Sequence, residues 1–220
     1  MEVRHPNLIT ILDMGFNDDG AYVVTEFIKS TSLREAIVRR GPLPYEVVRP
    51  LVEGAASALG ALHQVGIVSG GLNPETIRAV WGPSGPEKLL ISPLGLTSLL
   101  QVESLFQGPS GADAGLLEYI SPEQRAGAEP DPRSDLFSLA CIALEMLGEG
   151  PDKQATVAAK PEAAWPQEPP TRAWKGESVR WTPSEKLEPE RRRFFLRATE
   201  PDPAARFADT ASFLEALPRP

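Results

Sequence analysis

The chain has 220 residues, a formal net charge of −8 at pH 7 and a pI near 4.9. This acidic balance argues against a nucleic-acid-binding surface, and a hydrophobic fraction of 41 % is ordinary for a globular protein. No apolar run reaches the ~18 residues that a membrane span needs, so we expect no membrane contact. Residues 1–6 are too polar for a signal peptide, and the single Cys141 suits a reducing cytoplasm, where we expect the protein to act.

Two short runs rich in β-branched and aromatic residues, at positions 8–16 and 21–27, begin the chain. The four residues between them, Asn17-Asp18-Asp19-Gly20, are a strong turn signal. This pattern predicts a β-hairpin.

Two helices are expected after the hairpin. Ser32 precedes a short one, and residues 41–44 (Gly-Pro-Leu-Pro) separate it from a longer one. Apolar residues at three- and four-residue spacing predict that the longer helix is amphipathic and ends near Gly66. His63 lies at the end of this helix, and we expect it on the surface, where the helix dipole favours it.

The stretch around which the chain is organised follows this helix and reads Gly66-Ile67-Val68-Ser69-Gly70-Gly71-Leu72-Asn73-Pro74-Glu75-Thr76-Ile77. Its glycines and its Asn-Pro step are typical of a tight, fixed loop. The stretch resembles the catalytic loop of the protein kinases, in particular the bacterial serine/threonine kinases, which reads Gly-Ile-Val-His-Arg-Asp-Leu-Lys-Pro-Glu-Asn-Ile. The frame of that loop is kept here at Gly66, Ile67, Val68, Leu72, Pro74, Glu75 and Ile77.

The residues that carry the chemistry of that loop are replaced. Ser69 stands where the family has its histidine, Gly70 where it has the arginine and Gly71 where it has the catalytic aspartate. Asn73 replaces the lysine, and Thr76 replaces the metal-binding asparagine. The resemblance therefore implies that these degenerate positions are not catalytic.

A strand is expected at residues 89–91, followed by Pro93-Leu94-Gly95 where the family has Asp-Phe-Gly. The aspartate of the family holds Mg²⁺ on the phosphates, whereas the side chain of Pro93 offers no oxygen ligand, so we expect no metal. Residues 97–117 correspond to the activation segment. Their serines are either phosphorylation sites or part of a solvated loop.

The resemblance makes residues 22–28 the last strand of the small lobe, with Thr25 at the gatekeeper position. The backbone of the hinge residues Glu26, Phe27 and Ile28 would then meet the adenine of a nucleotide, and the alternative is a plain strand edge. The Gly-rich phosphate loop, the strand lysine and the helix glutamate that the family places before this point do not occur in the chain.

Two further motifs match the family at residues 115–124 and 202–207. The resemblance implies a buried ion pair between Glu123 of the first motif and Arg206 of the second. Asp135, near the start of a helix that is apolar on every face, would accept backbone N–H bonds from the degenerate loop. These three residues are therefore expected to be structural.

Residues 150–189 form a proline-rich, irregular segment that holds Trp165, Trp174 and Trp181. Its tryptophans either form a binding surface or pin the segment onto the rest of the protein. A last helix is expected at residues 210–217.

The resemblance implies an α+β, protein kinase-like fold with two parts. Residues 1–29 are expected to be a partial small lobe, made of its last two strands and the hinge. Residues 30–220 are expected to be a mostly helical large lobe.

We compared three functions. The first is a catalytically inactive domain, or pseudokinase, which is not an enzyme and needs no cofactor. Such a domain would act as a regulatory or scaffolding module by binding a protein partner. The second is a kinase-like domain that binds a nucleotide such as ATP without catalysis, or the C-terminal part of a longer serine/threonine kinase-like protein. The third is an active kinase with displaced catalytic groups. Because the usual residue for each task of phosphoryl transfer is replaced, the sequence favours the first.

Overall fold

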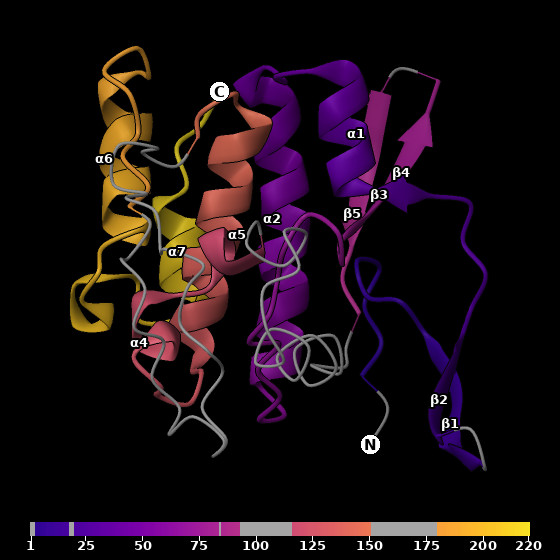
Figure 1. The fold of residues 1–220 in the computed structure, drawn as a ribbon. Coiled ribbons are helices and arrows are strands. Elements are labelled where there is room, and N and C mark those ends of the chain that lie inside the picture. Colours follow the sequence, from indigo (N-terminus) through magenta and orange to yellow (C-terminus); the bar gives the residue numbers. More distant parts are fainter. Residues whose placement is uncertain (1–2, 18–19, 84, 93–115, 151–179) are drawn as a thin grey trace, which may run out of the picture.

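The computed structural model describes residues 3–17, 20–83, 85–92, 116–150 and 180–220. Residues 97–115 of the expected activation segment, Pro93, Trp165 and Trp174 therefore lie outside the described residues. Figure 1 shows the elements, which are β1 (Ile11–Asn17), β2 (Gly20–Thr25), β3 (Thr31–Ser32), α1 (Leu33–Arg40), α2 (Tyr45–His63), β4 (Arg78–Gly82), β5 (Gly85–Leu90), α4 (Pro122–Arg125), α5 (Pro132–Met146), α6 (Pro189–Ala198) and α7 (Thr210–Ala216), with 3₁₀ turns at Leu116–Tyr119 and Pro203–Ala205.

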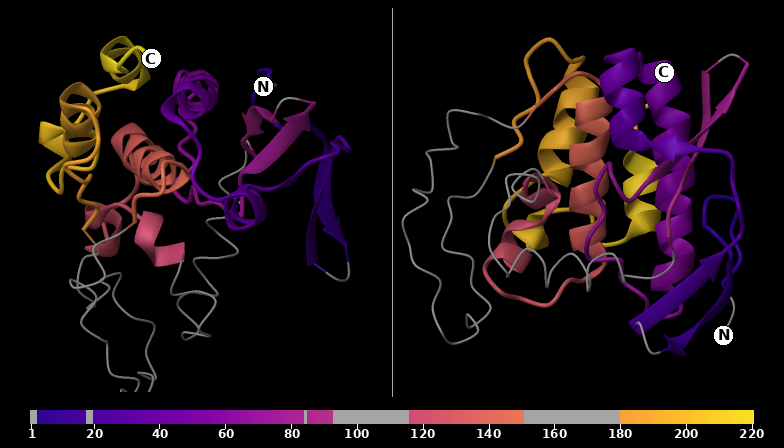
Figure 2. Two further views of the ribbon diagram at one scale, coloured as in Figure 1. Left: turned by 90° about the horizontal axis from the view of Figure 1, so that it is seen from above. Right: turned by 45° about the vertical axis from the view of Figure 1, so that its right-hand side comes forward.

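The expected β-hairpin is present. Strands β1 and β2 pair antiparallel, with Asn17 opposite Gly20 next to the turn, and a register shift lies between Ile11 and Asp13. Figures 1 and 2 show that this hairpin stands apart from the helices. Its large apolar side chains are exposed, most of all Phe16 at 88 %.

A second sheet has the strand order β3-β4-β5, and all its pairs are antiparallel. The sequence predicted a strand only at residues 89–91, whereas β5 covers Gly85–Leu90 and its partner β4 was missed. A parallel bridge between Leu8 and Ile91 joins the N-terminal segment to the end of β5. The two sheets are therefore connected next to the hinge.

Helices α2 and α5 pack against each other in the core. α2 buries the apolar stripe that its spacing predicts, and it contains Pro50. α5 is buried on almost every side, as expected, and the side chain of Asp131 caps its N-terminus by accepting from the backbone N–H groups of Arg133 and Ser134. The free thiol of Cys141 lies fully buried in this helix.

The C-terminal helices close the core with aromatic side chains. Phe194 of α6 lies 4.9 Å from Phe213 of α7 and 5.1 Å from Phe207, measured between ring centroids. The expected last helix is present as α7. Among the described residues, no helix combines the length and the apolar character that crossing a membrane demands.

Of the three tryptophans of the proline-rich segment, Trp181 is the one that lies among the described residues. Its side chain is buried, and its Nε1–H donates a hydrogen bond of 2.8 Å to the carbonyl oxygen of Glu118. Its ring lies 5.7 Å from that of Tyr119. Trp181 thus fastens this end of the segment to the core, in agreement with the second of the two expected roles.

Candidate functional site

The loop at residues 66–77, called the central loop below, is fixed by one buried carboxylate of α5. The N–H of Ser69 donates to Asp135 Oδ2 at 2.9 Å, and the N–H of Gly70 donates to Asp135 Oδ1 at 2.7 Å. Asp135 has no exposed surface. These contacts are the ones that the resemblance implied for Asp135.

Gly70 shows why the loop needs a glycine at this point. Its φ of 64° lies in the left-handed region, and an added Cβ would approach Cγ of Pro130 to 2.8 Å. Its carbonyl oxygen accepts a hydrogen bond of 2.6 Å from Nε2 of Gln124 in α4. Both α4 and α5 therefore hold the same residue of the loop.

The expected surface position of His63 is wrong. Its side chain is only 9 % exposed, and its Nε2–H donates to Oδ2 of Asp135 at 2.8 Å. The burial of the Asp135 carboxylate explains the difference, because a buried anion needs every available donor. Nδ1 of His63 is buried and has no partner among the described residues. The sequence signal for this contact was only the place of His63 at the end of α2, directly before the loop.

Asn73, which stands at the lysine position of the family, closes the central loop on itself. Its Oδ1 accepts from the N–H groups of Glu75 at 2.9 Å and Thr76 at 3.1 Å, and its Nδ2 donates to the carbonyl of Gly71 at 3.0 Å. The hydroxyl of Thr76 donates back to the carbonyl of Asn73 at 3.1 Å. These contacts form an Asx-type turn, so the side chain stabilises the loop.

The expected ion pair between Arg206 and Glu123 is present and has two hydrogen bonds. Nη1 of Arg206 donates to Oε1 of Glu123 at 2.8 Å, and Nη2 donates to Oε2 at 2.7 Å. Burial alone would raise the pKa of the Glu123 carboxyl, but the hydrogen bonds from Arg206 and Ser134 lower it below its ordinary value. The pair fastens the α4 region to the segment between α6 and α7.

The sequence missed a second, partly buried polar network beside the loop. The hydroxyl of Tyr119 donates to Oε2 of Glu145 at 2.6 Å and accepts from Nη2 of Arg34 at 2.7 Å. Arg34 also pairs directly with Glu145. Burial and the nearby Glu145 carboxylate raise the pKa of Tyr119 well above its ordinary value. The network links α1, the turn before α4, and α5.

The three hinge residues, Glu26, Phe27 and Ile28, differ in their contacts and in their exposure to solvent. The carboxylate of Glu26 accepts from the N–H of Thr10 at 2.8 Å, and hydrogen bonding to Thr10 lowers the pKa of Glu26. Phe27 is 96 % exposed. The N–H of Ile28 and the carbonyl oxygen of Glu26 have no hydrogen-bond partner in the described part of the chain.

A chain of hydrogen bonds steadies the hinge from the side of β4. Nη2 of Arg78 donates to the carbonyl of Ser30 at 2.7 Å, and Nε donates to the Ser30 hydroxyl at 3.2 Å. The Ser30 hydroxyl donates in turn to the carbonyl of Ile28 at 3.1 Å. Arg78 directly follows the central loop, so the loop and the hinge are mechanically connected.

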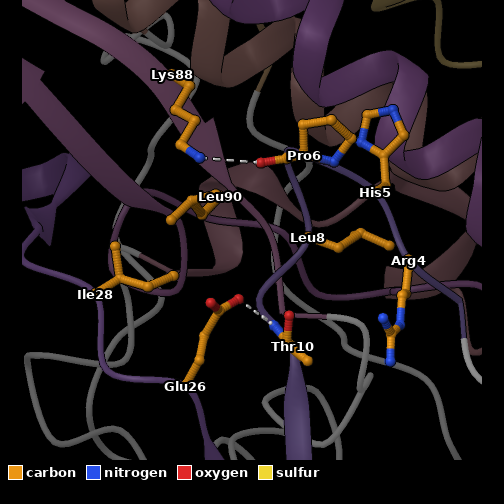
Figure 3. A pocket seen from close by; sticks show the side chains of 9 residues that line it. All are labelled: Arg4, His5, Pro6, Leu8, Thr10, Glu26, Ile28, Lys88 and Leu90. Atoms are coloured by element: carbon orange, nitrogen blue, oxygen red, sulfur yellow. Dashed lines mark hydrogen bonds between the residues drawn. The ribbon is translucent and has the colours of Figure 1, made fainter.

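A pocket opens between the N-terminal segment, the hinge and β5 (Figure 3). It has a volume of about 670 Å³, and we call it the Lys88 pocket. It is lined by Arg4, His5, Pro6, Leu8, Thr10, Glu26, Ile28, Lys88 and Leu90. Glu26 and Ile28 thus contribute to it, whereas the residues of the central loop do not.

The described residues contain no group of three histidine, cysteine, aspartate or glutamate side chains that could hold a metal ion. Glu75, the only carboxylate of the central loop, is half exposed and lies 3.6 Å from Nε of Arg34.

A family model described as the protein kinase domain matches residues 1–216. The chain belongs to the protein kinase family. It is 29 % identical over 217 residues to the serine/threonine-protein kinase pkn3 of Myxococcus xanthus. The aligned stretch covers 96 % of this chain and 38 % of that relative. It is 28 % identical over 214 residues to the serine/threonine-protein kinase PrkC of Bacillus subtilis, with coverage of 96 % and 31 %.

Solved structures agree with this family at the level of the fold. The PknI kinase domain of Mycobacterium tuberculosis superposes with a TM-score of 0.64 at 22 % identity, covering 97 % of this chain and 72 % of that one. The expected α+β, kinase-like fold class is thereby confirmed. The chain spans less than two fifths of the length of the curated kinase relatives named above.

The comparisons contradict the expectation that the chain is no enzyme, because its curated relatives are named as serine/threonine-protein kinases. The expectation depended on side-chain types at positions such as Gly71, Thr76 and Pro93. Replacement of these side chains does not by itself show that activity is lost, since a carboxylate or a cation can reach the same space from another position.

Proposed function

We propose that this chain is the nucleotide-binding part of a longer serine/threonine kinase-like protein, and that the hinge receives the adenine of ATP. The observation that carries the proposal is a pair of hinge backbone groups, the N–H of Ile28 and the carbonyl oxygen of Glu26, that have no hydrogen-bond partner among the described residues. The family supports the same ligand class, because its curated members are named as protein kinases, which take their phosphoryl group from a nucleotide.

The two hinge groups suit one edge of adenine. The exocyclic amine of adenine is a donor, and the ring nitrogen next to it is an acceptor. The Glu26 carbonyl can accept from the amine while the Ile28 N–H donates to the ring nitrogen. Two complementary hydrogen bonds in a partly desolvated place discriminate well against a base that lacks one of the groups.

The hinge is held in place before any ligand arrives. Arg78 fixes Ser30, and the Ser30 hydroxyl fixes the Ile28 carbonyl. The carboxylate of Glu26 is anchored on the N–H of Thr10, and the N–H of Glu26 donates to the Thr10 carbonyl at 3.0 Å. Such preorganisation lowers the entropy that binding would otherwise cost.

Phosphoryl transfer by this chain requires a base and a metal ligand from positions other than Gly71, Thr76 and Pro93. Incorporation of labelled phosphate from ATP into a general protein substrate measures this step separately from binding. A buried free thiol at Cys141 supports the reducing cytoplasm as the compartment in which the protein works.

A calorimetric titration with ATP, with and without Mg²⁺, tests the proposal. Ile28→Pro removes the donor N–H, whereas the matched control Ile28→Val keeps it. We expect the proline variant to bind ATP about tenfold more weakly and the valine variant to bind like the wild type. Inosine triphosphate, which lacks the exocyclic amine, should also bind more weakly. Equal affinity of all three proteins, or no binding of ATP, would overturn the proposal.

A second candidate role is contact with a protein partner through the β1–β2 hairpin. The observation that favours it is the exposure of Leu12, Met14 and Phe16 on β1 and of Tyr22, Val23 and Val24 on β2. Contiguous exposed apolar surface often marks an interaction site. Cross-linking from a photoreactive residue at position 16, compared with position 38 on α1, tests this role, because specific cross-links are expected only from the hairpin.

A further inference from the structure

We propose that the Lys88 pocket is a second ligand site, separate from the adenine hinge, and that it takes a small organic anion with an apolar body. This inference stands on the pocket itself and does not depend on nucleotide binding. The volume of about 670 Å³ lies within the range of roughly 300–1,000 Å³ that is usual for small-molecule sites. Three separate stretches of the chain, the N-terminal segment, the hinge and β5, supply its walls.

The charges of the pocket favour an anion. The cationic side chains are those of Arg4 and Lys88, and Glu26 is the acidic one. Burial lowers the pKa of His5, whose Nδ1 accepts from the N–H of Asn7 at 3.1 Å, so its imidazole is neutral at pH 7. The formal charges of the lining side chains therefore sum to about +1, whereas the whole chain carries −8. A positive pocket in an acidic protein attracts anions locally.

Lys88 supplies the free donors. Its Nζ donates a hydrogen bond of 3.3 Å to the carbonyl oxygen of Pro6, which is its only hydrogen bond among the described residues. An ammonium group has three N–H donors, so two remain for a ligand. Lys88 and Glu26 attract each other electrostatically, but no hydrogen bond joins them among the described residues.

The apolar part of the ligand has a place between the charged ends. Figure 3 shows Leu90 between the ammonium group of Lys88 and the carboxylate of Glu26, with Ile28 on one side and Leu8 on the other. An anionic head at Lys88 would therefore direct its body over these three aliphatic side chains and keep its charge away from Glu26. A carboxylate and a phosphate monoester both satisfy this description.

The site differs from the hinge in the groups that it offers. The hinge presents backbone groups of Glu26 and Ile28 to the adenine ring of a nucleotide, whereas the pocket presents side chains to an anion. No residue of the central loop lines the pocket. Glu26 and Ile28 belong to both sites, but through different groups, since their backbone would bind the nucleobase and their side chains line the pocket, so we expect the two sites to be occupied independently.

Calorimetric titration of the full chain with hexanoate and with hexyl phosphate tests the site and distinguishes the two head groups. We expect one saturable event per chain, with hexanol and acetate each at least about tenfold weaker because one lacks the charge and the other the apolar body. Saturable binding of either anion supports the site, and the tighter of the two identifies the head group.

The variant Lys88→Gln should bind the better anion about tenfold more weakly, while Lys88→Arg retains most of the affinity. Lys186→Gln, at an exposed lysine far along the chain, is the matched control and should bind like the wild type. Unchanged thermal melting of each variant verifies that the fold is intact. Equal affinity of Lys88→Gln and the wild type, or no saturable binding of either anion, overturns the proposal.

The same titration repeated at a saturating ATP concentration separates the two sites. Unchanged affinity for the anion supports two independent sites, and competitive displacement by ATP overturns the second site. If the chain does not bind ATP at all, the titrations without nucleotide still decide the question.

Discussion

The central loop and the β1–β2 hairpin differ in how many parts of the protein hold them. Asp135, Gln124 and Asn73 each fix the loop by hydrogen bonds, and two of these side chains come from helices far along the sequence. The hairpin is held mainly by its own ladder and leaves apolar side chains such as Phe16 exposed.

The difference shows that contacts from the core, and not the loop alone, fix the shape of the central loop. The loop keeps its shape because the groups that hold it, chiefly Asp135, lie in the core. A two-stranded hairpin is only marginally stable alone in water. Its exposed strands are therefore the part whose stability depends most on other protein surface.

The largest expected effect comes from breaking the ion pair of the helical part. Arg206→Ala leaves the partly buried carboxylate of Glu123 without its partner and should lower the free energy of unfolding by about 3–5 kcal/mol. Denaturant unfolding measures this change. Arg219→Ala, near the C-terminus, is the matched control and should change little. A small loss for Arg206→Ala would show that the pair contributes little.

Removal of the loop anchor is expected to have the next largest effect. Asp135→Ala leaves the N–H groups of Ser69 and Gly70 and the Nε2–H of His63 without their buried acceptor, at a cost of about 3 kcal/mol. Hydrogen exchange of the loop amides should accelerate as well. Asp13→Ala, on the exposed strand β1, serves as the control. If both variants were equally stable, the anchor would have no energetic role.

A smaller effect is expected from substitution of Gly70 in the central loop. Gly70→Ala forces a side chain into the left-handed region and against Pro130, which should cost about 1–2 kcal/mol. Gly150→Ala has open space around its Cβ and provides the comparison. Thermal unfolding of the two variants measures the difference, and equal melting temperatures would contradict the close approach seen at Gly70.

The stability contributed by Glu123 should depend on pH. The folded state holds the pKa of its carboxyl below the ordinary value of 4.5, so the contribution is complete above that value and disappears as the pH falls through the lower, folded pKa. The difference in unfolding free energy between the wild type and Glu123→Gln should therefore shrink in acid. A difference that stays constant from about pH 7 to about pH 3 would contradict the lowered pKa.

The smallest effect is expected on the hairpin. Phe16→Ser removes an exposed ring and should change the free energy of unfolding by no more than about 0.5 kcal/mol, whereas Phe213→Ala in the core should cost about 3–5 kcal/mol. Denaturant unfolding of both variants sharpens the comparison between the two regions. A large loss for Phe16→Ser would mean that the ring is covered in solution.

Local patterns were enough to predict much of the fold. The turn residues 17–20 specified the hairpin, and the apolar spacing specified α2, because both signals act over a few neighbouring residues. The role of Glu123 and Arg206 was available only through the resemblance to the kinases. Strand β4 was missed since its five residues carry no clear alternation.

The parts of the site that could not be predicted depend on contacts between distant residues. Arg34 and Glu145 are 111 positions apart, and the local sequence around either residue does not indicate that the other is its partner. His63 was misplaced for the same reason, because its partner Asp135 lies 72 positions away. That the N–H of Ile28 finds no partner within the described part of the chain is likewise visible only once the neighbouring backbone has been placed.

The burial of Cys141 gives the protein a built-in reporter of its own opening. It is the sole sulfhydryl of the chain and sits in the most enclosed helix, so a thiol reagent can reach it only when α5 becomes exposed. The rate at which Cys141 is alkylated in the native protein therefore measures how often the structure opens far enough to expose α5, and no label has to be introduced.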